Sequence, residues 1–201
     1  MTKPGISDRA TMLLREAGIA RTGELERHGV SRTQLRRLCE RGSVERVGRG
    51  LYTLPGAVLT EKHSLAEACR RVPGGVLCLL TALRFHGLTT QNPSEVWMAI
   101  DQKAWRPKQG SPRLHLVHLS GRSFREGVEE HDVSGVRIRV YSAAKTVADC
   151  FKFRNKVGLD VAVEALRDHR HLHPKRLDAL ARFAAADRVA RVIRPYLEAL
   201  G

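Results

Sequence analysis

Six arginines lie within the 22 residues from Ser31 to Tyr52, and only two acidic residues accompany them. A guanidinium presents its N–H groups in a fixed plane, which suits paired contacts to phosphate oxygens and to the edge of guanine. So many guanidiniums on one short stretch favour a polyanionic partner, nucleic acid first. The alternative is a solvated helix face that only adds charge, and the scarcity of acidic residues counts against it.

The spacing of these residues predicts a helix followed by a basic hairpin. Ser31 caps a helix that runs to about Arg41, with Leu35, Leu38 and Cys39 on its inward face. In a helix-turn-helix, the N-terminal end of such a helix contacts base edges and later basic residues reach phosphates. A turn at Gly48-Arg49-Gly50 joins two short strands into a wing near the next phosphates or the minor groove. The predicted DNA-binding residues are Ser31, Arg32, Thr33, Gln34, Arg36, Arg37, Arg41, Arg46 and Arg49.

A second constellation has the composition of a metal-dependent nuclease site. Glu95 precedes an apolar run, and Asp101 and Lys103 follow it. Such sites need two carboxylates that converge on a hard cation, with a lysine that activates water or steadies charge. The alternative is a buried strand that ends in a polar loop, and the short spacing from Glu95 to Asp101 favours it. A nuclease that uses Glu95, Asp101 and Lys103 is kept as the alternative function.

Histidine and cysteine patterns do not predict a metal site. His169, His171 and His173 alternate, but Pro174 begins the next helix and leaves His171 and His173 in a turn. The four cysteines contain no C-x-x-C pair, so neither a zinc site nor, in the cytosol, a disulfide is expected. No phosphate-binding glycine motif or nucleophile elbow occurs. We therefore expect no metal and no cofactor.

A further basic cluster follows the predicted helix N-cap at Ser142. Lys145 and Asp149 are four residues apart, which is typical of an ion pair on a helix surface. The lysines and arginine around them form a second patch that could meet a partner or more DNA. The possible antitoxin or partner surface consists of Lys145, Thr146, Asp149, Lys152, Arg154 and Lys156.

The order of elements predicts an α+β protein of two domains. Residues 1–56 are expected to hold three helices and a β-hairpin, the layout of a winged helix-turn-helix. Residues 57–201 are expected to form a mixed α/β domain that ends in a helical segment. Within it we expect an apolar helix over 75–86, strands over 95–100 and 114–119, a hairpin turned at Ser134-Gly135, and helices over 142–153, 159–169, 174–186 and 188–200.

Charge and hydropathy restrict the class of protein. The 201 residues carry a net charge of +14, and both expected domains are basic. No run approaches the length of a membrane span and the N-terminus resembles no secretory signal, so we expect a cytoplasmic protein without a membrane partner. A module that only binds another protein, with incidental charge, remains open and predicts no DNA binding at moderate salt.

Three segments resemble the AbiEi family of antitoxins, the repressor half of type IV toxin–antitoxin (abortive infection, phage defence) systems. The resemblance spans nearly the whole chain. The segments are RVGRGLYTLPG (46–56), CLLTALRFHGLTTQNPSEVWMAI (78–100) and SAAKTVADCFKFRNKVGLDVAVEAL (142–166).

The resemblance implies a function that the residues alone do not give. Members of the family are transcriptional autorepressors that bind inverted repeats in their own promoter, and they are not enzymes. They counter a nucleotidyltransferase-like toxin without forming a stable complex with it. By matching positions, DNA contact falls to the arginine-rich helix and wing, whereas no role can be carried over to Lys145, Thr146 or Asp149.

Overall fold

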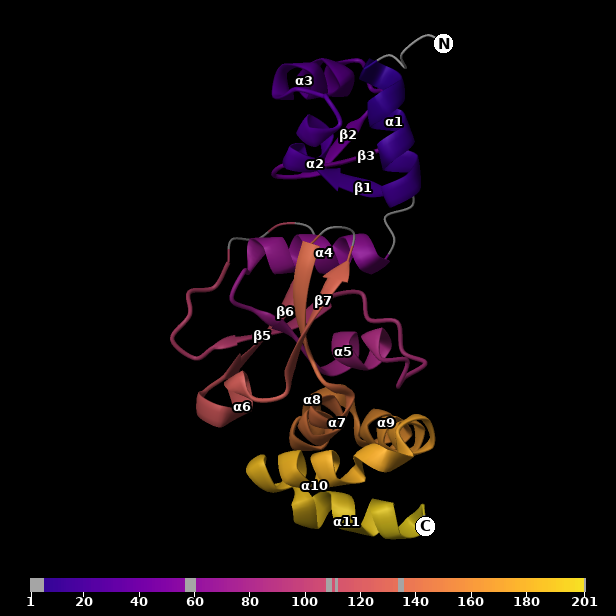
Figure 1. The fold of residues 1–201 in the computed structure, drawn as a ribbon. Coiled ribbons are helices and arrows are strands. Elements are labelled where there is room, and N and C mark those ends of the chain that lie inside the picture. Colours follow the sequence, from indigo (N-terminus) through magenta and orange to yellow (C-terminus); the bar gives the residue numbers. More distant parts are fainter. Residues whose placement is uncertain (1–5, 57–60, 108–109, 111, 134–135, 201) are drawn as a thin grey trace. The chain divides into compact units, whose positions relative to one another are not determined.

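The computed structural model describes residues 6–56, 61–107, 110, 112–133 and 136–200 (Figure 1). The chain divides into two compact units: unit 1 consists of residues 1–67 and 132–137, and unit 2 of residues 68–131 and 138–201. Both helices and sheets are present, so the α+β class is confirmed. The functional boundary at residue 56 stays a prediction. Within the described residues, no helix has the length and apolar character that crossing a membrane requires.

Unit 1 contains three helices and a three-stranded antiparallel sheet. Its elements are α1 (Ile6–Ala17), β1 (Ile19–Arg21), α2 (Thr22–Arg27), α3 (Arg32–Glu40), β2 (Glu45–Gly48) and β3 (Leu51–Thr53). The strand order is β1-β3-β2, with Ala20 and Arg46 on either side of Tyr52. The three predicted helices and the hairpin are present. The three-residue strand β1 was not predicted, because so short a segment has no measurable alternation.

A small apolar core holds these helices together. Leu14 of α1, Leu25 of α2 and Leu35 and Leu38 of α3 are buried in one cluster with Val30 of the connecting turn. Burial of each such side chain stabilises the fold by roughly 1.5–3 kcal/mol. Leu35 and Leu38 face inward as predicted, so the opposite side of α3 is left to solvent.

Unit 2 is built on a five-stranded sheet of order β6-β5-β4-β8-β7, of which Asp132 and Val133 of β7 and Val136 and Arg137 of β8 are assigned to unit 1. The strands are β4 (Val76–Leu77), β5 (Val96–Asp101), β6 (Leu114–Leu119), β7 (Val128–Val133) and β8 (Val136–Tyr141). β4 pairs antiparallel with β5 and parallel with β8, and β5 pairs parallel with β6. The predicted turn at Ser134-Gly135 lies outside the described residues.

Helices flank the sheet and form a group at one end of unit 2 (Figure 1). Helix α7 packs against α5, α9, α10 and α11, and its residues from Ala143 to Phe151 are buried. The remaining bounds are α4 (Glu61–Arg71), which crosses the division between the units, α5 (Leu79–Phe85), α6 (Gly121–Arg125), α7 (Ala143–Lys152), α8 (Arg154–Val157), α9 (Leu159–Leu172), a 3₁₀ turn (Pro174–Arg176), α10 (Leu177–Ala186) and α11 (Ala190–Ala199).

The predicted helix over 75–86 is wrong in its first half. Val76 and Leu77 pair with Ala99 and Met98 as strand β4, and α5 begins only after Cys78. A short apolar run suits a buried strand and a buried helix equally well. Here the partner strands, which lie far along the chain, decide the outcome.

Candidate nucleic-acid interface

The turn between α2 and α3 fixes how α3 is presented. Gly29 adopts a φ of +77°, which a side chain would strain, and its N–H donates to Glu26 O. Val30 then inserts into the core and donates its N–H to Leu25 O. The chain is thus led from α2 into α3 by a tight, anchored turn.

A reciprocal capping box begins α3. Ser31 Oγ accepts from the Gln34 N–H at 3.4 Å, and Gln34 Oε1 accepts from the Ser31 N–H at 2.7 Å. The predicted N-cap is therefore present. Gln34 was predicted to contact DNA; its carbonyl oxygen already accepts the cap hydrogen bond, so its amide N–H groups are the part of the side chain left free of the cap.

The outer face of α3 carries exposed guanidiniums. Arg32 Nε lies 3.0 Å from Glu26 Oε1, and Arg36 Nε lies 3.2 Å from Glu40 Oε1. The Arg36 side chain is 77% exposed, and such exposed pairs contribute about 0–1 kcal/mol. Phosphate oxygens can therefore replace these carboxylates at little cost. Arg37 and Arg41 are also exposed on this helix and its C-cap, together with Thr33.

The hairpin after α3 carries two more exposed arginines. Arg46 Nε donates to Gly48 O at 3.1 Å, which holds that side chain along the strand. The register between β2 and β3 shifts between Arg46 and Gly48, and Gly50 adopts a φ of +75°. The resulting tight tip leaves Arg49 exposed. Unit 1 thus carries all the predicted arginines on the surface of one helix and one hairpin.

The nuclease residues do not form a site. Glu95 and Asp101 lie at opposite ends of β5, and six residues of strand span roughly 20 Å. Glu95 Oε2 lies 3.4 Å from His115 Nδ1, and Asp101 Oδ1 accepts from the Lys103 N–H. Two carboxylates so far apart cannot share one metal ion, so the alternative function lacks its geometry.

Lys145 and Asp149 were expected to pair on the surface. This expectation is wrong, because both side chains are buried. Lys145 Nζ donates to Asp149 Oδ1 and, at 3.0 Å, to Asp187 Oδ2. Thr146, also buried, donates its hydroxyl to Tyr141 O. The i,i+4 pairing was predicted correctly, but Lys145, Thr146 and Asp149 belong to the interior of unit 2.

Asp187 links this interior pair to a second lysine and a serine. Its Oδ1 accepts from Lys152 Nζ at 2.9 Å and from Ser123 Oγ at 2.8 Å. Neither Asp187 nor Ser123 was predicted from the sequence to take part. They come from the C-cap of α10 and from α6, so no local spacing in the sequence connects them to α7.

The two carboxyls of this network, Asp149 and Asp187, differ in pKa. Burial raises the pKa of Asp149 to about 7, with Lys145 opposing and Asp187 adding to the rise. Burial, the largest single influence on Asp187, raises its pKa, but the charge of Lys145 and the hydrogen bonds with Asp149, Lys152 and Lys145 together outweigh burial and lower the pKa to about 2. Burial opposes the charge of Lys145 itself, yet the two carboxylates hold its pKa above the ordinary value.

The rest of the expected partner surface is scattered. Lys152 is half-buried and bonded to Asp187, and Arg154 Nη1 donates to Phe151 O at 2.9 Å. Lys156 is exposed. The six residues therefore do not assemble into one exposed patch.

The histidines near the end of α9 show no metal geometry. His169 is fully buried, and burial, followed by the charges of His173, Arg176 and His86, lowers its pKa to about 4. Its ring lies 5.3 Å from that of His173. No group of three or more histidine, cysteine, aspartate or glutamate side chains in the described part of the chain could hold a metal ion. All four cysteines are free.

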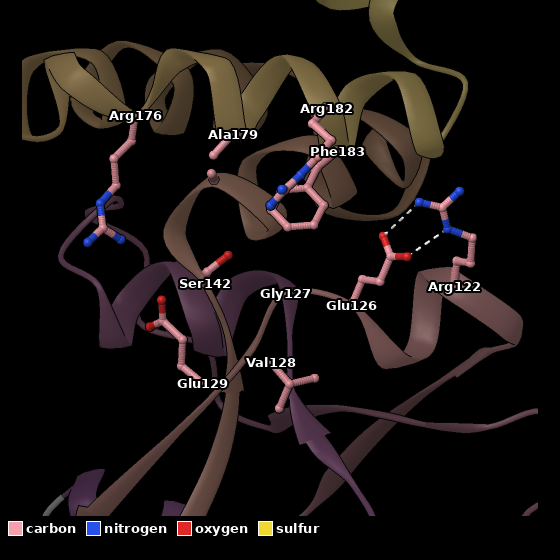
Figure 2. A pocket seen from close by; sticks show the side chains of 11 residues that line it. Arg122, Glu126, Gly127, Val128, Glu129, Ser142, Arg176, Ala179, Arg182 and Phe183 are labelled. Atoms are coloured by element: carbon pink, nitrogen blue, oxygen red, sulfur yellow. Dashed lines mark hydrogen bonds and ion pairs between the residues drawn. The ribbon is translucent and has the colours of Figure 1, made fainter.

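A cavity of about 500 Å³ lies within unit 2 between α6, α7 and α10 (Figure 2). Arg122 is paired with Glu126, with Nε 2.6 Å from Oε1, and Arg182 lies over the ring of Phe183. Glu129 also lines the cavity. The cavity therefore mixes cations with carboxylates and has no uniform charge. Its lining consists of Arg122, Glu126, Gly127, Val128, Glu129, Ser142, Ala144, Arg176, Ala179, Arg182 and Phe183.

A similarity to a known protein family is found within unit 1. No curated protein matches the chain at a significant level. Residues 8–55, which extend from α1 to just beyond β3, match the family model described as "Transcriptional regulator, AbiEi antitoxin". This stretch contains α3, the hairpin and all nine residues predicted to contact DNA. Residues 8–55 of this chain are therefore similar to the AbiEi antitoxin family of transcriptional regulators.

Proposed function

We propose that the protein is a sequence-specific autorepressor of its own promoter and the antitoxin of a type IV toxin–antitoxin system. In this proposal residues 1–56 act as a winged helix-turn-helix, with α3 in the major groove and the β2–β3 hairpin as the wing. Residues 57–201 act as the antitoxin domain. Its target is a nucleotidyltransferase-like toxin, which it counters without a stable complex.

One observation carries the DNA-binding part of the proposal. Arg32, Arg36, Arg37 and Arg41 are exposed on α3, while Leu35 and Leu38 anchor the helix to the core. A rigid helix with one buried apolar face and one cationic face can enter a groove without unfolding. Arg46 and Arg49 extend the positive surface onto the hairpin, where the next phosphates would lie.

The match of residues 8–55 to a family of antitoxin transcriptional regulators supports the same role. It also supports the proposal that the chain is not an enzyme. The antitoxin part rests on this match and on the resemblance of segments 78–100 and 142–166, since the network around Lys145 is buried and offers no contact surface by itself.

The test is a gel-shift titration with about 200 base pairs from upstream of the gene, at two salt concentrations and with unrelated duplex as competitor. Wild-type protein is expected to form a complex that survives the competitor. The double variant Arg36→Ala/Arg37→Ala is expected to lose it, and the dependence of log K on log salt should fall by about 2 if both residues contact phosphates.

Arg194→Ala is the matched control. Arg194 and Glu198 form an exposed i,i+4 pair on α11, with side chains 78% and 64% exposed, against 77% and 61% for Arg36 and Glu40. Loss of the α11 pair should leave the shift unchanged. Retained specific binding in the α3 double variant would contradict the assignment of α3. A shift lost equally to any duplex would contradict sequence-specific repression.

Toxin neutralisation needs its own assay. Co-expression with a nucleotidyltransferase-like toxin encoded beside the gene is expected to restore growth. The Arg36→Ala/Arg37→Ala variant should restore it equally, because the two activities are assigned to different domains. Failure of the wild-type protein to restore growth would remove the antitoxin part and leave the repressor part standing.

A further inference from the structure

Trp105 stands almost wholly in solvent in unit 2. Its side chain is 96% exposed, whereas the other tryptophan, Trp97, is 8% exposed and stacks on His115. Met12, at 67%, is the next most exposed large apolar side chain among the described residues. An indole carries 150–250 Å² of mostly apolar surface, so its position here needs a reason other than packing.

The loop that carries Trp105 follows from the sheet topology. β5 and β6 pair in parallel, so the chain must return along the length of the strands before it can pair again. The described residues of this connection, 102–107, 110 and 112–113, belong to no strand or helix. The topology requires a crossing but not a tryptophan on it.

The base of this loop is held in a fixed turn. The N–H of Gln102 donates to Leu119 O, and the N–H of Ala104 donates to Asp101 O, both at 2.9 Å. Asp101 Oδ1 accepts from the Lys103 N–H at 2.9 Å. Trp105 therefore projects from an anchored turn, which lowers the entropy lost when a ligand binds there.

The surroundings of Trp105 are cationic. Arg106 follows it directly and Lys103 lies two residues before it, and both are exposed. Beside the turn lies a hollow of about 580 Å³ to which Lys103 and Arg125 contribute positive charge, with Asp101, Gln102, Ser120 and Gly121 as the other lining residues. Across the described residues, Lys103, Arg106 and Arg125 take part in no ion pair with a carboxylate, so their charges are available to a partner.

An isolated aromatic ring between unpaired cations matches one kind of partner well. The bases of a single strand expose their faces and stack on aromatic side chains, while cationic side chains follow the phosphates. A duplex hides the base faces. The apolar centre of a protein interface would surround the ring with other apolar side chains, whereas the exposed side chains of Lys103 and Arg106, close in sequence, are charged.

We propose that Trp105 is the stacking platform of a binding site for single-stranded nucleic acid. One unpaired base stacks on the indole, and the adjoining phosphates lie against Lys103, Arg106 and the hollow beside Arg125. This site is separate from the duplex-binding face assigned to α3 and does not depend on it.

The experiment uses the full chain and two readouts. Fluorescein-labelled 12-nucleotide strands of U and of dT are titrated by anisotropy, and quenching of tryptophan emission is recorded with the unlabelled strands. Trp105 should be quenched because it is the exposed tryptophan. We expect Trp105→Ala to weaken binding about tenfold or more and Trp105→Phe to retain part of the affinity. The two strands distinguish RNA from DNA as the source.

Controls separate stacking from charge. An abasic 12-nucleotide strand keeps the phosphates but has no bases, so it should bind wild-type protein about as weakly as the dT strand binds Trp105→Ala. Lys103→Ala/Arg106→Ala should also weaken binding, whereas Arg194→Ala should not. Equal affinity of wild type and Trp105→Ala for both strands would overturn the proposal, as would equal affinity for abasic and intact strands.

The two proposals fail separately. Trp105→Ala should shift the upstream duplex as wild type does, and Arg36→Ala/Arg37→Ala should leave Trp105 quenching by the single strands in place. Protection of Trp105 by a protein, with no quenching by either strand, would assign this surface to a protein partner and overturn the nucleic-acid proposal.

Discussion

Lys145 and Asp187 lie 42 positions apart in the sequence, and their Nζ and Oδ2 atoms lie 3.0 Å apart in the interior of unit 2. The same ammonium also donates to Asp149, so one cation serves two buried carboxyls. A buried charge is costly unless it is paired, and removal of one partner leaves the others uncompensated. These contacts connect α7 with the C-terminal end of α10.

Lys145→Met should therefore destabilise unit 2 by about 3–5 kcal/mol. The measurement is urea unfolding followed by the fluorescence of buried Trp97, in a Trp105→Phe background that removes the exposed indole. Lys156→Met is the control, because Lys156 is exposed and should change stability by less than about 0.5 kcal/mol. Equal stability of the two variants would show that the ammonium does not hold the network together.

Asp149 should give stability an unusual dependence on pH. Its pKa is about 7 in the folded protein, above its ordinary value of 3.8, so the folded state binds the proton more tightly. Its contribution is fully present below about pH 4 and is lost as the pH rises toward 7. His169, whose pKa is lowered to about 4, acts in the opposite direction over much of this range.

Asp149→Asn isolates the first effect, since the amide resembles the protonated carboxyl. We expect this variant to lose the fall in stability between about pH 4 and pH 7 while keeping the contribution of His169. The measurement is the urea midpoint at half-unit steps of pH. A variant whose pH profile overlays that of wild type would contradict the assignment of this proton to Asp149.

Gly127 and Gly87 form a matched pair of left-handed positions, with φ values of +73° and +68°. A Cβ on Gly127 would lie 2.9 Å from Lys145 Cβ and 2.9 Å from Phe183 Cζ, whereas a Cβ on Gly87 meets nothing within 4 Å. Gly87→Ala should cost only the conformational strain of about 1–2 kcal/mol. Gly127→Ala should cost a further 1–3 kcal/mol from overpacking. Equal midpoints for the two variants in urea would refute the predicted clash.

Gln34→Glu should separate the stability of α3 from its proposed DNA contact. Glutamate can accept the Ser31 N–H as Gln34 does, and its negative charge is favourable in the first turn of a helix. Hydrogen exchange over residues 31–41 should thus stay as slow as in wild type or become slower. Binding to the upstream duplex should weaken, because the new carboxylate would face phosphates.

Gln34→Ala is the companion variant, since it removes the cap acceptor without adding charge. It should speed exchange over 31–41 by an amount that corresponds to about 1 kcal/mol. If Gln34→Glu bound the duplex as tightly as wild type, the N-terminal end of α3 would not lie near the DNA backbone.

Local patterns made unit 1 predictable. The helix after Ser31, its N-cap and the inward face of Leu35 and Leu38 depend on neighbours within four residues, and the structure has all of them. In unit 2, the pairing of Lys145 with Asp149 followed from spacing, but their burial did not. Asp187 and Ser123, which share that interior, are distant in sequence, and no periodicity reports such contacts.

Contacts between residues distant in sequence also explain the error at residues 75–86. Val76 and Leu77 become a strand only because Met98, Ala99 and Val140 are in place to pair with them. Trp105 was missed for another reason. The polar residues and prolines around it show no helix or strand periodicity, so no pattern singles out this tryptophan. Its only signal was its rarity, since the chain has two tryptophans.

The two-residue strand β4 limits how early the sheet of unit 2 can form while the chain is being synthesised. It is the only connection between the β6-β5 pair and the β8-β7 pair in the order of the described sheet, and Leu77 needs Val140 beside it. The sheet of unit 2 therefore cannot close until 63 further residues have left the ribosome after Leu77. The apolar core of α1, α2 and α3 draws its buried residues from Ala10 to Val44. The arginine-bearing helix can thus reach its folded form while the ribosome is still translating the other unit.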